Sequence, residues 1–183
     1  MQVISYDNPL APLLIRNHLF TCLPEAMEQL IVLCIGSNRI NGDSLGPFVG
    51  TLLTGLYPNH LTVIGTLKEP LDATNLGATI HQLTISPSTC VVAIDSVVGM
   101  QPYVHSIAIR SRPLKAGSAL NKRFPAVGDV SIMGVMLEEK KELHELPYTN
   151  LHVVYQMARA IATGISLTVR QRFSYHTTSP VLT

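Results

Sequence analysis

Residues 30–47 read Leu-Ile-Val-Leu-Cys-Ile-Gly-Ser-Asn-Arg-Ile-Asn-Gly-Asp-Ser-Leu-Gly-Pro, and this stretch decides the fold class of the chain. The apolar run 30–35 predicts a buried strand, and apolar residues at helical spacing predict a helix over 45–57. A polar turn containing two glycines joins them and ends at Asp43. This is the strand–loop–helix unit of an α/β domain, with the Asp43 carboxylate at the start of the helix.

Similar patterns continue along the chain and predict a single domain over residues 1–183. We interpret 1–24 as an irregular N-terminal segment that contains a short helix at 11–20, and 170–183 as a frayed tail. The order of elements predicts a three-layer α/β/α sandwich with a mixed, mostly parallel sheet that contains one antiparallel strand. The further strands are expected at 61–65, 90–94, 103–109 and 129–137, and the further helices at 72–83 and 151–169.

Composition narrows the class of protein. Hydrophobic residues make up 46% of the chain and charged residues 14%, and the formal net charge is +1. Such a balance gives no reason to expect a nucleic acid or a membrane surface as partner. The N-terminus lacks the pattern of a signal peptide, and the apolar segment 151–169 is interrupted by polar residues, so we expect a cytoplasmic protein without a membrane span.

The three cysteines form no CxxC pair. Cys34 and Cys90 lie within apolar runs, so we interpret them as small core residues in a reducing compartment.

Two aspartates are the candidate catalytic residues. Asp95 follows the apolar run 90–94, as Asp43 follows the loop after the run 30–35. If these two strands are neighbours, both carboxylates face one crevice at the carboxyl ends of the strands. Two close carboxylates share a proton near neutral pH, so one serves as a base and the other as an acid. The helix N-terminus favours the charged form of Asp43, so the proton is expected mainly on Asp95.

Other interpretations of the same residues remain open. Asp43 could simply cap its helix, and Asp95 could simply accept hydrogen bonds from loop amides. The carboxylates could also bind a metal ion together with His81 or His105. No HExxH or paired-histidine spacing supports this, so no metal site is predicted.

Several loop residues are secondary candidates. Glu69, just after the second predicted strand, is either a third carboxylate of the site or a solvated loop residue. Asn38 and Asn41 either donate to a substrate carbonyl or hold the loop in place.

Three familiar motifs are incomplete or absent in this sequence. Residues 42–45 spell Gly-Asp-Ser-Leu, which resembles the signature of the GDSL esterases, but the aspartates are not followed by a histidine three residues later, as that family requires. No Walker A motif and no G-x-G-x-x-G is present, so no nucleotide and no other cofactor is predicted.

Residues 34–47 resemble the C-I-G-S/T-x-R-x-x-G-D-S/A-L-G-P signature of the YyaC family of sporulation proteins. Further segments match this family in the same order, namely Gly-Thr-Leu-Lys-Glu-Pro at 65–70, Val-Ala-Ile-Asp at 92–95 and the glycine-rich stretch 117–134. The resemblance implies that loop or substrate-binding residues include Asn38, Gly42, Glu69, Gly117, Asn121 and Asp129. Asn38 stands where the family commonly has Asp.

The YyaC family in turn resembles the spore germination protease, an aspartic-type endopeptidase, and more distantly the hydrogenase maturation proteases. Carried over residue by residue, the two catalytic aspartates fall on Asp43 and Asp95. The implied fold is the phosphorylase/hydrolase-like α/β/α sandwich with a five-stranded mixed sheet. The chain lacks room for the additional segments and propeptide of the full protease.

The resemblance implies a small hydrolase that acts on a peptide or protein, with a role in sporulation. Two alternatives stay open, a non-catalytic protein that binds a peptide in the same crevice and a metal-recognising maturation peptidase. Whether the chain forms a homo-oligomer is also left open.

Overall fold

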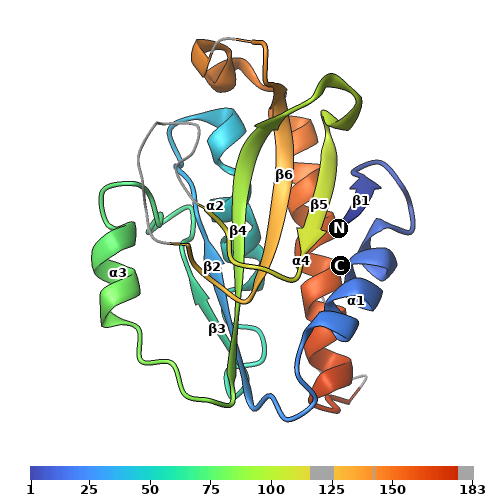
Figure 1. Cartoon of the computed structure of the whole chain (residues 1–183), viewed down its shortest axis with the longest axis vertical. Helices are drawn as coiled ribbons and strands as arrows, with labels where there is room; N and C mark the ends of the chain where they lie inside the picture. The colour runs from blue at the N-terminus through green and yellow to red at the C-terminus, as the bar shows by residue number, and fades with distance from the viewer. Residues whose placement is uncertain (116–125, 142, 177–183) are drawn as a thin grey trace.

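The computed structural model describes residues 1–115, 126–141 and 143–176. One six-stranded sheet, in the order β1-β5-β6-β4-β2-β3, runs through the centre of the molecule (Figure 1). Its strands are β1 (Gln2–Ser5), β2 (Gln29–Cys34), β3 (Leu61–Ile64), β4 (Thr89–Gly99), β5 (Ser106–Arg110) and β6 (Val130–Glu138). The helices are α1 (Ala11–Cys22), α2 (Leu45–Leu53), α3 (Leu76–Gln82) and α4 (Leu151–Arg172), with 3-10 turns η1 (Asn41–Asp43), η2 (Gln101–Tyr103) and η4 (Leu143–Tyr148).

The sheet is mixed, as the sequence predicts. Strands β6, β4, β2 and β3 pair in parallel, whereas β5 is antiparallel to both of its neighbours, β6 and β1. The predicted neighbours are also adjacent, because β2 pairs with β4 from Gln29 opposite Thr89 to Cys34 opposite Ile94.

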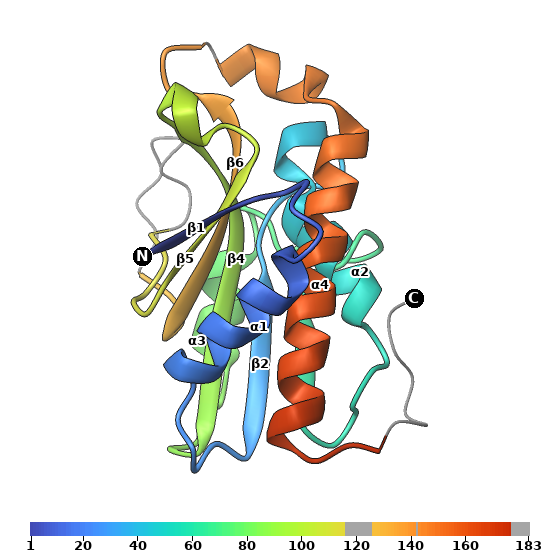
Figure 2. The same ribbon diagram turned by 90° about the vertical axis from the view of Figure 1, so that its right-hand side faces the viewer.

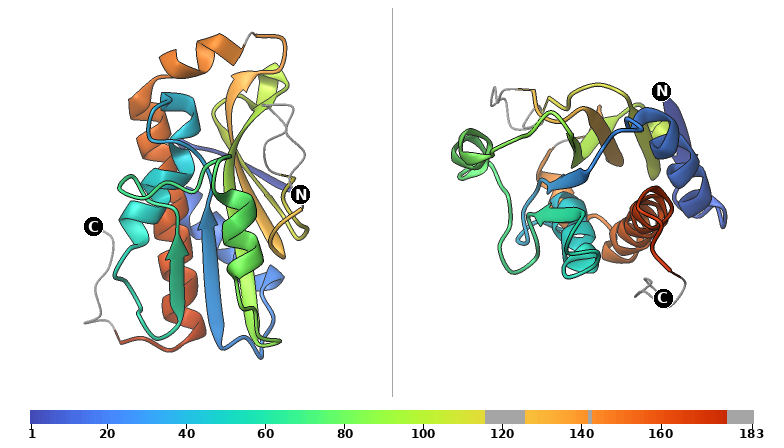
Figure 3. Two further views of the ribbon diagram at one scale, coloured as in Figure 1. Left: turned by 90° about the vertical axis from the view of Figure 1, so that its left-hand side faces the viewer. Right: turned by 90° about the horizontal axis from the view of Figure 1, so that it is seen from below.

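Helices cover both faces of the sheet, which confirms the three-layer architecture (Figures 2 and 3). Helices α1, α2 and α4 lie on one face, and α3 lies on the other. Alternate residues of the central strands supply the two apolar layers, with Val32 and Ile94 facing the first layer and Leu33 and Ala93 facing the second. This double burial explains why β2 and the first half of β4 are uninterrupted apolar runs.

The N-terminal segment corrects the sequence interpretation. Residues 1–24 are not irregular, since they contain β1 and α1, and the sheet therefore has six strands instead of five. β1 has four residues, and only Ile4 is buried, so the strand is too short to show alternation in the sequence. Its pairing with β5, from Gln2 opposite Ile109 to Ser5 opposite Ser106, holds it in place.

Other element bounds also differ from the expectations. β4 does not stop at Asp95 but continues to Gly99, because β6 pairs with it beyond the end of β2. α3 begins at Leu76 instead of Asp72, since the Asp72 side chain accepts from the N–H and hydroxyl of Thr74 in a turn before the helix. α4 continues to Arg172, past the expected start of the tail.

Cys34 and Cys90 are buried, as predicted, and Cys22 is half-buried; all three are free thiols. Within the described ranges, the structure contains no helix that is both long and apolar enough to cross a membrane.

Candidate functional site

Asp43 is carried by a loop whose backbone is tied in place on two sides. After β2 ends, the Gly36 N–H donates to the Leu71 carbonyl at 3.0 Å, and the Ser37 N–H donates to the Asp43 carbonyl at 2.9 Å. Gly36 has φ +142°, and a side chain there would collide with the Asp43 carbonyl oxygen. The glycine is therefore required both for the backbone conformation and for the close approach of the loop to itself.

The outer side of this loop packs against η4 and the residue that follows it. Gly42 is buried, and a Cβ on it would lie 2.5 Å from Leu146 Cδ1 and 2.7 Å from Thr149 Oγ1. The Asn41 side-chain amide donates to the Thr149 carbonyl at 3.2 Å. Asn41 and Gly42 thus act in holding the loop, and the contact with η4 fixes the position of Asp43.

Asp95 lies one residue beyond the last paired position of β2. The Ile35 N–H donates to the Ile94 carbonyl at 2.8 Å, after which β2 has ended, whereas β6 continues with Met133 opposite Asp95. The Asp95 residue is only 8% exposed, and its Oδ1 accepts the N–H of Ser96 at 2.8 Å. A buried carboxyl group is thereby held on β4, just beyond the end of β2.

Burial and nearby negative charge raise the pKa of both aspartates. Burial raises the pKa of Asp43 to about 6, a shift that the Ser37 N–H opposes and the charge of Asp72 reinforces. The pKa of Asp95 is raised well above its usual value, first by burial and then by the charge of Asp43, with the Ser96 N–H opposing. The structure therefore brings Asp43 and Asp95 within electrostatic reach of each other, and the pKa of each carboxyl group is raised.

Asp72 is a third carboxylate near this pair, although its position in the sequence indicates only the start of the helix predicted over 72–83. It follows Leu71, which forms a parallel bridge with Ile35 at the end of β2. That bridge places Asp72 close enough to Asp43 to raise the pKa of the Asp43 carboxyl group. The only signal in the sequence is the position of Asp72 directly after the segment 65–70, which matches the YyaC pattern.

Asn38 and Glu69 lie on the surface near the Asp43 loop. The Asn38 side-chain amide donates to the Leu67 carbonyl at 2.8 Å, which links the two loops. Glu69 lies 3.9 Å from the ammonium group of Lys68, and both side chains are exposed by more than 80%. In this arrangement Asn38 holds the loop and Glu69 is a solvated residue.

Asp129 lies at the other end of the sheet. It precedes the first residue of β6, and its Oδ2 accepts the N–H of Val91, four residues before Asp95 in β4. Four residues of a strand span about 13 Å, so Asp129 does not join the carboxylate pair. Gly117 and Asn121 lie outside the described residues.

The histidines considered for a metal site have other surroundings. His81 lies in the last turn of α3, exposed to solvent, and the ring of His105 packs edge-on against Tyr6. Among residues 1–115, 126–141 and 143–176, no group of three or more His, Cys, Asp or Glu side chains could hold a metal ion.

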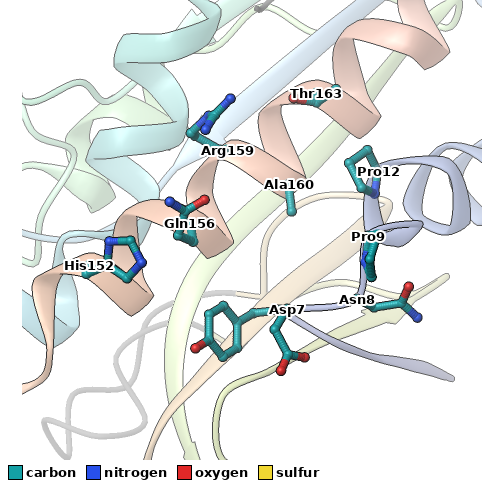
Figure 4. A pocket seen from close by; sticks show the side chains of 10 residues that line it. Asp7, Asn8, Pro9, Pro12, His152, Gln156, Arg159, Ala160 and Thr163 are labelled. Atoms are coloured by element: carbon teal, nitrogen blue, oxygen red, sulfur yellow. The ribbon is translucent and has the colours of Figure 1, made fainter.

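A separate cavity of about 420 Å³ lies between the turn after β1 and the outer face of α4 (Figure 4). Asp7 and Asn8 line one side, and His152, Gln156 and Arg159 line the other, at helical spacing along α4. Neither Asp43 nor Asp95 lines this cavity, so it is distinct from the carboxylate pair.

Comparisons with known proteins agree with the sequence resemblance and with the fold. The chain is 33% identical to a protein of Bacillus subtilis (strain 168) described as "Uncharacterized protein YyaC", over 98% of this chain and 89% of that protein. The crystal structure of the NiFe hydrogenase maturation protease HycI from Thermococcus kodakarensis KOD1 is similar with a TM-score of 0.50 and 15% identity, covering 78% of this chain and 93% of that chain. At this identity the likeness shows a shared protease-like α/β fold. Residues 3–164 match the family described as "Protein of unknown function (DUF1256)", and the chain belongs to this family.

Proposed function

We propose that this protein is a hydrolase of the germination-protease type, in which Asp43 and Asp95 activate water against an amide bond. The observation that carries the proposal is that two carboxyl groups from different elements are both buried and lie within electrostatic reach of each other. Asp43 ionises with a pKa of about 6, whereas the pKa of Asp95 is raised well above its ordinary value. We assign the carboxylate base to Asp43 and the carboxylic acid to Asp95, which is the pairing that acid–base hydrolysis needs.

The two groups take different parts in the proposed reaction. The half-buried Asp43 carboxylate removes a proton from water, and the resulting hydroxide attacks the carbonyl carbon of the amide. The protonated Asp95 donates to the carbonyl oxygen, where negative charge develops. On collapse of the tetrahedral intermediate, the proton held by Asp43 passes to the leaving nitrogen, and Asp95 regains its own proton.

The surroundings of each aspartate suit its part. The Ser96 N–H donates to Oδ1 of Asp95, which leaves the other oxygen to carry the proton. The Ser37 N–H stabilises the ionised form of Asp43, so its pKa stays near 6 although the group is largely buried. A base with a pKa just below the working pH is ionised and still accepts a proton readily.

The wider context of the proposal comes from likeness. The fold shared with a hydrogenase maturation protease supports proteolysis, and the YyaC-like sequence motifs support a role associated with sporulation. We further propose that the substrate is a peptide or protein and that the protein works in the cytoplasm. Nucleic acid and membrane are not part of the proposal, because the net charge of +1 provides no attraction for either.

One observation favours a second candidate function, a non-catalytic protein that binds peptides. Asp95 is 8% exposed, which limits how closely a reacting carbonyl can approach it. In such a protein the buried acid serves only as a hydrogen-bond donor to a bound peptide.

Cleavage of a peptide library distinguishes the two functions. The wild-type protein is compared with Asp43→Asn, with Asp95→Asn and with the control Glu139→Gln, which removes an exposed acid outside the site. We expect cleavage by the wild type and by the control, and a loss of at least a hundredfold in both aspartate variants. Absence of cleavage by the wild type, or full activity in both Asn variants, overturns the hydrolase proposal.

A further inference from the structure

A cavity of about 390 Å³ lies on the same face of the sheet as Asp95 and beside it. Val97 lines the cavity and is two residues along β4 from Asp95, so both side chains point to the same side. Met133 also lines it and is the partner of Asp95 across the β4–β6 pair. The cavity therefore begins about one strand spacing, roughly 5 Å, from the acid.

The far side of this cavity is cationic. Arg110, which lies opposite Ser131 at the end of β5, lines it together with Arg112 and Lys115 from the segment that follows. In Figure 1 this segment leaves the end of β5 and crosses the sheet in front of β6 and β4. The charged side chains that line the cavity among residues 1–115, 126–141 and 143–176 are all positive.

Within the described part of the chain, these positive side chains form no ion pair with an acid. The ion pairs there are Lys68 with Glu69 and Lys141 with Glu145, and neither involves the cavity. Arg110 donates from Nε to the sulfur of Met1 at 3.1 Å and forms no ion pair with a described residue. Three positive side chains line this partly enclosed cavity, and its described lining residues include no acid, so the cavity favours a ligand that carries a negative charge.

We propose that this cavity is an anion subsite for the substrate, which binds a carboxylate of the peptide a few residues from the bond that Asp43 and Asp95 act on. This inference rests on the proposed function for the position of the reacting bond. Arg110 lies two strand spacings from β4, roughly 10 Å. An extended peptide covers about 3.5 Å per residue, so the carboxylate belongs to about the third residue from the bond.

Such a carboxylate has two sources, an acidic side chain within a longer peptide and the C-terminus of a peptide that ends there. Both place the same group among Arg110, Arg112 and Lys115. The expected ligand of the subsite is therefore a peptide that carries a carboxylate, and the experiment below distinguishes the two sources.

Binding is measured with the Asp43→Asn variant, so that no peptide is consumed. Fluorescein-labelled alanine octapeptides with amidated C-termini carry either Glu or Gln at one position, and a second pair ends in a free or an amidated C-terminus. Fluorescence anisotropy at low salt is expected to give roughly tenfold tighter binding for the carboxylate member of at least one pair. The pair that shows the preference identifies the source, and the preference is expected to fall in 1 M NaCl because salt screens charges beyond about 3 Å.

Further substitutions in the Asp43→Asn variant test whether the preference for a carboxylate arises from the cavity. Arg112 and Lys115 are exposed, so Arg112→Gln and Lys115→Gln leave the core unchanged, and each is expected to reduce the preference roughly threefold. The double variant is expected to abolish it. The matched control Lys140→Gln removes one exposed positive charge after β6, away from the cavity, and is expected to leave the preference unchanged.

Two results overturn the inference, namely equal binding of the members of both pairs and a preference that persists in the double variant. Failure of the proposed function gives a different result. In that case the wild type cleaves none of the peptides, while the carboxylate preference and its dependence on Arg112 and Lys115 are retained.

Discussion

The Asp95 carboxyl group lies within electrostatic reach of Asp43. Burial is the main cause of its raised pKa, and the negative charge of Asp43 raises it further. The two residues come from different elements, the interior of β4 and the η1 turn after β2. β4 continues beyond the end of β2, and the η1 turn that follows β2 contacts β4. The pairing of the two strands thus brings two residues that are distant in sequence into electrostatic contact.

The first prediction concerns the pH dependence of cleavage. The base must be ionised, so activity is expected to fall about tenfold for each pH unit below the pKa of Asp43, which is about 6. Burial is the main cause of this raised pKa, and the charge of Asp72 adds to it. Asp72→Asn is therefore expected to move the acid limb of the pH–rate profile to lower pH, whereas Glu139→Gln is expected to leave it in place. A profile of Asp72→Asn that coincides with the wild type contradicts this assignment.

The second prediction concerns stability. The pKa of Asp43 is 3.8 without the fold and about 6 within it, so the folded protein binds the proton more tightly. Its contribution to the free energy of unfolding is fully present below about pH 4 and is lost as the pH rises through 6. At about 1.4 kcal/mol per pH unit the loss is up to about 3 kcal/mol.

Asp43→Asn removes the buried charge. At pH 7.5 its free energy of unfolding, measured by urea denaturation, is expected to exceed that of the wild type by about 1–3 kcal/mol. At pH 4 no increase is expected. A gain of the same size at both pH values would show that packing, not charge, is responsible. Glu139→Gln, in which the substituted acid is exposed, serves as the control.

The third prediction compares two glycines in helices. A methyl group on Gly50 of α2 would collide with the carbonyl oxygen of Gly65, whereas one on Gly77 of α3 would meet nothing within 4 Å. Gly50→Ala is expected to lower the free energy of unfolding by about 1–3 kcal/mol, because the helix must move away from the backbone after β3. Gly77→Ala is expected to raise it by up to about 1 kcal/mol through helix propensity alone. Equal effects of the two substitutions in thermal or urea unfolding would contradict the close packing of α2.

The fourth prediction concerns the contact between η1 and η4. Gly42→Ala places a methyl group 2.5 Å from Leu146 Cδ1, so the turn that carries Asp43 must shift. Cleavage is expected to fall about tenfold or more, because small displacements of a catalytic group are costly. Adding Leu146→Ala makes room for the methyl group and is expected to restore part of the activity. If the double variant recovers no activity, the loss in Gly42→Ala does not arise from the contact with Leu146, and the prediction is contradicted.

The central strands and the candidate pair were accessible from the sequence for a physical reason. Buried parallel strands are continuous apolar runs, and the polar residues that end such runs in the sequence mark the edge of the sheet where sites form. The runs before Asp43 and Asp95 therefore indicated both the neighbouring strands and the position of the carboxylates.

The remaining features of the fold and of the site depend on contacts between distant segments, which no local sequence pattern indicates. The short strand β1 exists because β5 offers an edge, and the continuation of β4 past Asp95 depends on β6. Asp72 reaches the neighbourhood of Asp43 only through the bridge between Ile35 and Leu71. Asp129 matched a family motif, yet it lies beside Val91 near the start of β4, four residues before Asp95, because the order of motifs carries no information on strand length.

The location of Asp95 within β4 limits how this molecule can adapt. A residue in the middle of a strand, hydrogen-bonded to its neighbour and covered on the other face by packed helices, cannot be displaced without disturbing the whole sheet. The turn that carries Asp43 rests instead on two glycines and a few backbone contacts. Variation among related chains in reach, spacing or strength of the pair is therefore expected to arise on the Asp43 side, with the acid serving as the fixed reference point.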